Sequence, residues 1–225
     1  MRLAKKATCQ VVVLIHKRGG VYFSICLAEV VRKVVMAILN RRFITSITFH
    51  DVIHGFWAGI STFTTSLEYK LLQQLTATRE EVLYTIFMEL YKAYGTLYRE
   101  ICLDILEGYG VGPLARRILH DYWYRLRVVD CMGGYHREDF HYFGGWLRGT
   151  LSPPTIFNVM VDAAVHHWIL LVAVCAGGKD GWGREVIYRD AFSYKNDVLV
   201  ALTDPVWLQG SFDTLTTGYF DRVGI

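Results

Sequence analysis

The hydrophobic pattern of the chain changes repeatedly between short β-branched runs and stretches with apolar residues three and four positions apart. Residues 9–15 form a β-branched run that ends in a basic, glycine-containing turn, which predicts a strand and a loop. Residues 21–42 pass from a short strand into a helix. The next helix is defined by apolar positions and begins after a Thr/Ser cluster that can cap it. Its apolar positions are Leu67, Leu71, Leu72 and Leu75.

The second half of the chain continues this mixture. Residues 81–90 are a nearly continuous apolar run, which predicts a strand buried on both faces. Three helices are predicted to follow. After them come a hairpin and a final helix that Asp204 can cap. The predicted helices are 98–110, 113–129 and 151–172, and the hairpin is 191–205. Strands and helices without internal repeats predict the α+β class.

Composition narrows the functional classes. The 225 residues can bury the core of one large or two small domains, and 52% are hydrophobic, which excludes a disordered chain. A net charge of +3 names no partner, but basic residues occur in pairs. These could form a patch that attracts phosphates, or they could be ordinary solvated surface. The pairs are Lys5-Lys6, Lys17-Arg18, Arg32-Lys33, Arg41-Arg42 and Arg116-Arg117.

The cysteines and the apolar segments bear on the compartment. Five widely spaced Cys without a C-x-x-C favour reduced thiols in an intracellular protein, and Cys131, His136 and His141 lack the fourth ligand of a zinc site. The basic amino terminus precedes a short apolar run without a cleavage site, so we expect no secretion. Residues 156–176 are long enough to span a bilayer, but Asp162 interrupts them, and a buried helix explains them better.

Two predicted strands carry an acidic residue near one end. Glu89 closes the run 81–90, and Asp197 follows Asn196 at the turn of the hairpin. Carboxylates on neighbouring strand ends can hold a pair of divalent cations roughly 3.5–4 Å apart, the arrangement that promotes phosphoryl transfer. Hard oxygen ligands favour Mg²⁺. The alternative interpretation is two solvated acids at ordinary strand ends.

Five segments, in the same order along the chain, resemble the motifs of reverse transcriptases. In the family these motifs read I-P-K with a short R-x-I run, G-F-R-x-G-R, F-x-D-L-x-K-A-[FY]-D, Q-G-x-P-L-S-P-x-x-F-N and Y-x-D-D. The corresponding residues are 11–42, 47–75, 85–112, 151–168 and 193–197. The resemblance covers most of the chain and is nearest to the retrotransposon and group II intron-like enzymes.

This resemblance implies a right-hand polymerase with an antiparallel palm sheet backed by helices. Fingers would comprise 1–80 and the palm 81–225, with a return to the fingers around 108–145; because the sequence ends at Ile225, no thumb is expected. Template-directed nucleotidyl transfer would use Mg²⁺ or Mn²⁺, an RNA template and a DNA primer. The residues implied are Glu89, Asn196 and Asp197 for catalysis, Glu89 and Asp197 as metal ligands, and Lys17, Tyr94, Arg148 and Gly149 at the nucleotide.

The residues that differ from the family motifs are those with catalytic or triphosphate-binding functions in the family. Glu89 replaces an Asp and extends the carboxylate by about 1.5 Å, the length of one C–C bond. Asn196 replaces an Asp and removes one negative charge. Trp57, Ile60 and Phe23 stand where the family has arginines that clamp a triphosphate. We therefore expect an impaired or inactive polymerase, and the alternative is a non-catalytic retroelement remnant that at most binds nucleic acid.

Overall fold

The structure is a computed structural model, and it describes residues 9–17, 21–56, 59–90, 93–132, 135–136, 139–142, 144–147, 149, 153–176, 191–194 and 197–224. The chain divides into two compact units. Unit 1 comprises Met1–Thr48 and Tyr94–Phe157, and unit 2 comprises Phe49–Ala93 and Asn158–Ile225. Residues 49–80, which the resemblance assigns to the fingers, therefore share a unit with β3, whereas residues 108–145 share a unit with the amino-terminal segment.

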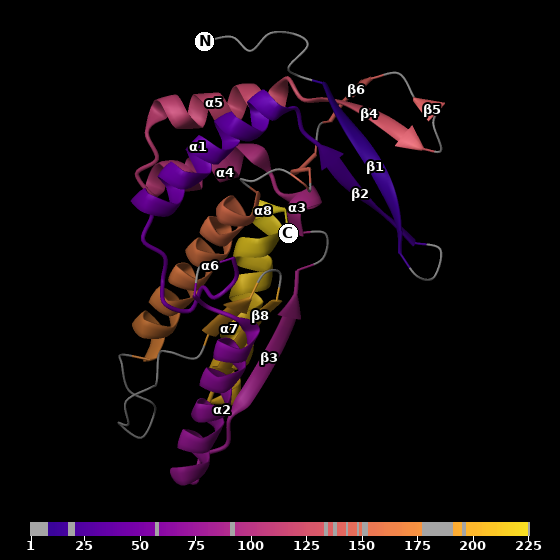
Figure 1. Cartoon of the computed structure of the whole chain (residues 1–225). Coiled ribbons are helices and arrows are strands. Elements are labelled where there is room, and N and C mark those ends of the chain that lie inside the picture. Colours follow the sequence, from indigo (N-terminus) through magenta and orange to yellow (C-terminus); the bar gives the residue numbers. More distant parts are fainter. Residues whose placement is uncertain are drawn as a thin grey trace. The chain divides into compact units, whose positions relative to one another are not determined.

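Unit 1 combines a mixed sheet with helices. Among the described residues, the sheet has the strand order β2-β1-β4-β5, with β6 also paired to β4. Its strands are β1 (Cys9–Lys17), β2 (Val21–Leu27), β4 (Arg127–Met132), β5 (Tyr135–His136) and β6 (Phe140–His141). Its helices are α1 (Val30–Ser46), α3 (Ala93–Thr96), α4 (Arg99–Gly108) and α5 (Pro113–Tyr124). The long β1–β2 hairpin and the α1, α4 and α5 group are visible in Figure 1.

The interior of unit 1 joins its sheet to its helices. Val12, Cys26 and Val128 pack together from three strands, with Leu126 and Leu147 beside them. Helix α1 contacts α5 where the Arg32 guanidinium lies over the Tyr122 ring, 4.7 Å from its centroid. Because these side chains come from β1, β2 and β4, their packing holds the three strands together in one sheet.

One part of unit 1 corrects the sequence-based prediction. The helix expected over 113–129 ends at Tyr124, and β4 begins at Arg127. Strand β4 pairs in parallel with β1, with Cys9 opposite Arg127 and Val13 opposite Cys131. Val128 and Val129 are β-branched and suit a strand. Their pairing with β1, more than a hundred residues away, cannot be predicted from local helical periodicity.

Unit 2 is built on an antiparallel sheet of strand order β3-β8-β7 among the described residues. Its strands are β3 (Tyr84–Glu89), β7 (Ala191–Tyr194) and β8 (Asp197–Leu202). Its helical segments are α2 (Thr62–Thr78), most of α6 (Pro153–Ala176), α7 (Pro205–Asp213), the π-helical η2 (Thr214–Phe220) and α8 (Asp221–Val223). Helix α7 packs on β3 and β8 (Figure 1). Helix α2 contacts β7. The predicted α+β class is confirmed.

The two faces of this sheet differ in burial. Val198, Val200 and Leu202 of β8 are each 1–2% exposed, whereas Phe87 of β3 is 71% exposed. Phe87 lies opposite Leu199, so it projects from the other face. The prediction that residues 81–90 form a strand buried on both faces is therefore wrong, because one face of β3 is open at Phe87.

Two helix caps and the longest apolar helix agree with what the sequence predicts. Ser61 caps α2 through a capping box with Thr64, and Asp204 caps α7 by accepting hydrogen bonds from the backbone N–H groups of Val206 and Trp207. In the part of the chain that the structure describes, no helix is both long and apolar enough to span a membrane. Helix α6 instead buries Asn158 and Asp162 with its apolar residues.

The two cysteines with described side chains, Cys26 and Cys102, are free thiols. Burial raises the pKa of Cys26 to about 11 and the pKa of Cys102 to about 12. An unfolded cysteine has a pKa of about 8.5. Below that pH both states are protonated and the full stability is present, and stability is lost as the pH rises because only the unfolded state releases its proton.

We therefore expect the free energy of unfolding to fall between pH 8.5 and pH 11. Urea unfolding at a series of pH values measures it, and Cys102→Ala should flatten the decline. Alkylation of both thiols at pH 8 should require unfolding, since the thiolate is the reactive form. Rapid alkylation of Cys26 or Cys102 in the folded protein at pH 8, located by peptide mapping, would contradict this prediction.

Candidate functional site

The two predicted metal ligands meet on adjoining strands of unit 2. Strand β3 ends at Glu89, strand β8 begins at Asp197, and the antiparallel ladder sets these two residues directly opposite each other. Residues in such positions have Cβ atoms about 4.5–5.5 Å apart and project from the same face. The expectation that residues 89 and 197 become neighbours on one sheet is confirmed. Their function as metal ligands stays a prediction.

The register also shows which other residues share the carboxylate face. Phe87 lies opposite Leu199, two positions before Glu89, and therefore projects from the same side. In β7, Phe192 pairs with Leu199 and Tyr194 pairs with Asp197. This face thus carries two acids at the hairpin end and an apolar surface behind them.

A pocket of about 350 Å³ lies over this face, and α2 forms its second wall. Helix α2 contributes Thr65, Ser66 and Tyr69 to the lining. The Tyr69 hydroxyl lies 3.2 Å from the Thr85 hydroxyl of β3. The Tyr69 ring makes edge contacts with Phe87 and Phe192, at centroid distances of 6.1 and 6.3 Å. Tyr69 therefore holds α2 against the sheet beside the pocket.

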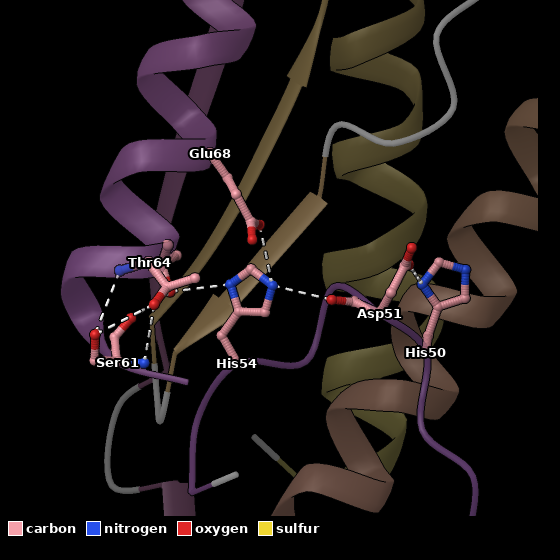
Figure 2. A network of polar contacts seen from close by, with 7 residues as sticks. His50, Asp51, His54, Ser61, Thr64 and Glu68 are labelled. Carbon is pink, nitrogen blue, oxygen red and sulfur yellow. Dashed lines mark hydrogen bonds and ion pairs between the residues drawn. The ribbon is translucent and has the colours of Figure 1, made fainter. Parts of the chain in front are cut away.

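A buried imidazole ties the preceding loop to α2 (Figure 2). His54 is 2% exposed, and its Nδ1 lies 2.9 Å from the Thr65 hydroxyl. Its Nε2 lies 2.9 Å from the Asp51 carbonyl oxygen and 3.3 Å from a carboxylate oxygen of Glu68. Because both of these partners only accept hydrogen bonds, Nε2 carries a proton. The imidazole thus links a loop to two successive turns of the helix that walls the pocket.

The same loop borders the hairpin. The backbone N–H of His54 donates to the Ser193 carbonyl at 2.8 Å, and the Ser193 N–H donates to the Val52 carbonyl at 2.9 Å. Ser193 precedes Tyr194, which pairs with Asp197. Loop residues 52–54 therefore add a short parallel bridge to the edge of β7 and fix the strand from which the hairpin extends.

Helix α6 supports this loop with two buried polar side chains. Asn158 Nδ2 donates to the Gly55 carbonyl at 2.6 Å, and the Asp162 carboxylate accepts from the His50 N–H at 2.7 Å. Both side chains are less than 5% exposed. Sequence reasoning assigned no site function to His54, Asn158 or Asp162. The sequence signal that could have found Asn158 and Asp162 is their spacing, two polar residues four positions apart on a mostly apolar helix.

The remaining predicted site residues are distributed differently. Asn196 and Arg148 lie outside the described residues, as does the side chain of Lys17, the last residue of β1. Tyr94 and Gly149 belong to unit 1, whereas Glu89 and Asp197 belong to unit 2. These nucleotide-binding assignments stay predictions.

Tyr94 and Gly149 are both packed within unit 1. The Tyr94 ring lies 5.3 Å from the Phe157 ring, and its carbonyl oxygen accepts a 2.5 Å hydrogen bond from the Trp146 N–H. Gly149 has φ +102°, and a Cβ at this position would overlap the Cys26 carbonyl oxygen of β2. Glycine is therefore required here by close backbone packing as well as by conformation.

The donor set suits a hard divalent cation only in part. The facing carboxylates of Glu89 and Asp197 offer the oxygen ligands that Mg²⁺ and Mn²⁺ accept. Among the residues that the structure describes, no group of three or more His, Cys, Asp or Glu side chains could hold a metal ion. The side chains of Cys131 and His136 lie outside this part of the chain. The described residues therefore provide two carboxylates at this site, and both line an open pocket.

Comparison with solved structures identifies the fold. The chain is similar to apo telomerase from Candida tropicalis truncated from its C-terminal domain, with a TM-score of 0.69 and 12% identity over 99% of this chain and 49% of that one. Telomerase from the same organism in complex with the TWJ fragment of telomeric RNA gives 0.69 and 12% over 100% and 40%. The corresponding Candida albicans complex gives 0.64 and 11% over 100% and 43%.

These likenesses concern the fold alone. Telomerase is a reverse transcriptase, so the chain has a coarse reverse-transcriptase-like fold. The chain spans about half or less of the length of these telomerase chains. No protein-family model matches the chain. No curated protein matches it either.

Proposed function

We propose that this chain is a reverse-transcriptase domain in which the β3-β8-β7 sheet of unit 2 belongs to the palm. The observation that carries the proposal is the register that sets Glu89 opposite Asp197, at the strand ends where the sequence resembles the two catalytic motifs. The reverse-transcriptase-like fold supports it independently of those motifs. The substrates would be an RNA template, a DNA primer and deoxynucleoside triphosphates, and two solved telomerase neighbours are complexes with an RNA fragment.

In this proposal Glu89 and Asp197 hold Mg²⁺ or Mn²⁺ between the strand ends. Such ions, when bound, activate the attacking hydroxyl oxygen and stabilise the leaving oxygen in phosphoryl transfer. The bridge between residues 52–54 and β7 keeps the hairpin in register with β3. Tyr94, Lys17 and Arg148-Gly149 would contact the nucleotide, as the resemblance implies. The retroelement origin stays a prediction from the sequence.

Impaired activity is part of the proposal. Glu89 is longer than the Asp of the motif, and Asn196 supplies a neutral amide where the motif has a carboxylate. A second candidate function is therefore nucleic-acid binding without catalysis. The observation that favours it is the small donor set, because the described residues offer only two facing carboxylates at these strand ends.

Primer extension on an RNA template, with Mg²⁺ and separately with Mn²⁺, tests the proposal. We expect slow incorporation by the unchanged protein, and a loss of at least about a hundredfold in Glu89→Gln, because removing an interaction made in the transition state costs roughly that much. Asp104→Asn, an exposed change on α4, is the matched control and should retain activity.

The two candidate functions predict different outcomes. No product with either metal would reject catalysis. Binding to a primer–template duplex that weakens steeply between 50 and 200 mM salt would then support the non-catalytic alternative, since neutralising phosphates releases counterions. Absence of binding at 50 mM salt would reject both.

A further inference from the structure

The pocket in unit 2 combines an aromatic lining with two acids. Tyr69, Phe87, Phe192 and Leu199 provide its apolar surface. Phe87 is 71% exposed and projects from β3, an edge strand of the sheet among the described residues. A volume of about 350 Å³ is within the usual range of roughly 300–1,000 Å³ for small-molecule sites. An open aromatic side chain in a concave site favours a ligand that can cover it.

The two carboxylates of the pocket determine which charge the ligand should carry. Glu89 and Asp197 both line this pocket, and both are exposed. None of the ion pairs formed among the described residues involves either of them. Like charges directly opposite on two strands destabilise the ladder. A cation placed between them would relieve this repulsion, whereas an anion would be repelled.

We propose that this pocket binds an organic cation with an aromatic body, of the arylalkylammonium class. The ring would cover Phe87 and contact Tyr69, and the ammonium group would lie at Glu89 and Asp197. Aromatic faces attract ammonium groups, and aromatic rings add favourable edge and offset contacts, so both ends of such a molecule are recognised. A bare metal ion would leave the apolar surface uncovered, and a neutral arene would leave the acids unpaired.

This inference goes beyond the proposed polymerase function and does not depend on it. The ammonium group and a divalent cation would compete for the same two carboxylates. The pocket is therefore a site at which a small molecule would compete with the divalent cation of the proposed function, and this competition alone rests on that function. The hydroxyl of Ser66 at the α2 wall offers a further hydrogen bond for selectivity.

Titration calorimetry on the full chain at low salt tests the proposal, with 2-naphthylmethylammonium as the probe and neutral 2-naphthylmethanol as its matched control. We expect the cation to bind several-fold more tightly than the alcohol, because an ion pair with each exposed carboxylate contributes a modest gain in affinity. The double change Glu89→Gln with Asp197→Asn should remove this difference. Phe87→Ala should weaken both probes by about tenfold, as expected for a lost aromatic contact.

Matched changes elsewhere separate the pocket from general surface binding. Phe63→Ala removes another exposed phenylalanine, 75% exposed on α2 and outside the pocket lining, and should leave both affinities unchanged. Mn²⁺ should weaken binding of the ammonium probe and not of the alcohol. Equal affinities for the two probes, or insensitivity to the double change, would overturn the proposal. Failure of primer extension would leave it standing, since no polymerase step is measured.

Discussion

Changing Glu89 to Asp and Asn196 to Asp together should raise nucleotide incorporation by at least about a hundredfold. The longer Glu side chain places the carboxylate about 1.5 Å beyond the position of an Asp carboxylate. A misplacement of about 1 Å at a reacting centre costs roughly a hundredfold in rate. Asn196→Asp adds a negative charge next to Asp197 in the sequence, and added negative charge strengthens the attraction for divalent cations. This prediction rests on the proposed function.

Single-nucleotide primer extension with Mg²⁺ measures the effect, and calorimetric titration of Mn²⁺ measures metal affinity separately. Glu29→Asp is the matched control, because Glu29 is exposed before α1 and its side chain makes no capping hydrogen bond. The double variant should gain in both measurements. A gain in metal affinity without a gain in incorporation would place the defect elsewhere in the chain, and no gain in either would reject the two substitutions as the cause of impairment.

Replacing Arg99 by Met should lower the free energy of unfolding by at least about 3 kcal/mol. The Arg99 guanidinium is buried in unit 1 and donates to three carbonyl oxygens, those of Gly145 at 2.9 Å, Trp123 at 3.0 Å and Gly144 at 3.2 Å. Each buried acceptor left without a donor costs about 1–3 kcal/mol. Burial also lowers the pKa of Arg99, because removing the charged guanidinium from water costs free energy. Arg99→Met removes this cost, which offsets part of the stability lost with the three hydrogen bonds.

Urea unfolding followed by circular dichroism measures this change. The melting temperature should fall by roughly 6–12 °C, at about 2–4 °C per kcal/mol for a chain of this size. Arg99→Lys keeps the charge but cannot reach three carbonyls in a planar fork, so it should be nearly as destabilising. Arg117→Met removes an exposed arginine of α5 and is the control. A loss of less than about 1 kcal/mol in Arg99→Met would show that water replaces the missing donors.

Local signals in the sequence located many of the elements. The β-branched run at residues 9–15 forms β1, and the Ser61 and Asp204 caps mark the first turns of α2 and α7. The hairpin at 191–205 also forms, but Asp197 is the first residue of β8 and not part of the turn. Capping and turn chemistry involve residues a few positions apart, so one sequence contains enough information to find them.

Long-range pairing was beyond the reach of the same reasoning. Residues 127–129 continue the helical pattern of α5, yet they enter a parallel ladder with β1, more than a hundred positions away. The burial of β3 was misjudged because Phe87 has the apolar character of a core residue while α2 leaves it 71% exposed. The His54 network was also missed, since its partners Asp51, Thr65 and Glu68 come together only when the loop folds against α2.

The sequence by itself determined that this chain is an α+β protein and that two acids, Glu89 and Asp197, end or begin apolar strands. Periodicity, caps and turn residues act over short distances along the chain, and they are encoded locally. Only the tertiary structure decided that these acids lie directly opposite each other and share their face with an aromatic pocket. A shift of one residue in the β3–β8 ladder would turn one acid to the other face, and the register is fixed by burial of Val198, Val200 and Leu202 on the far side.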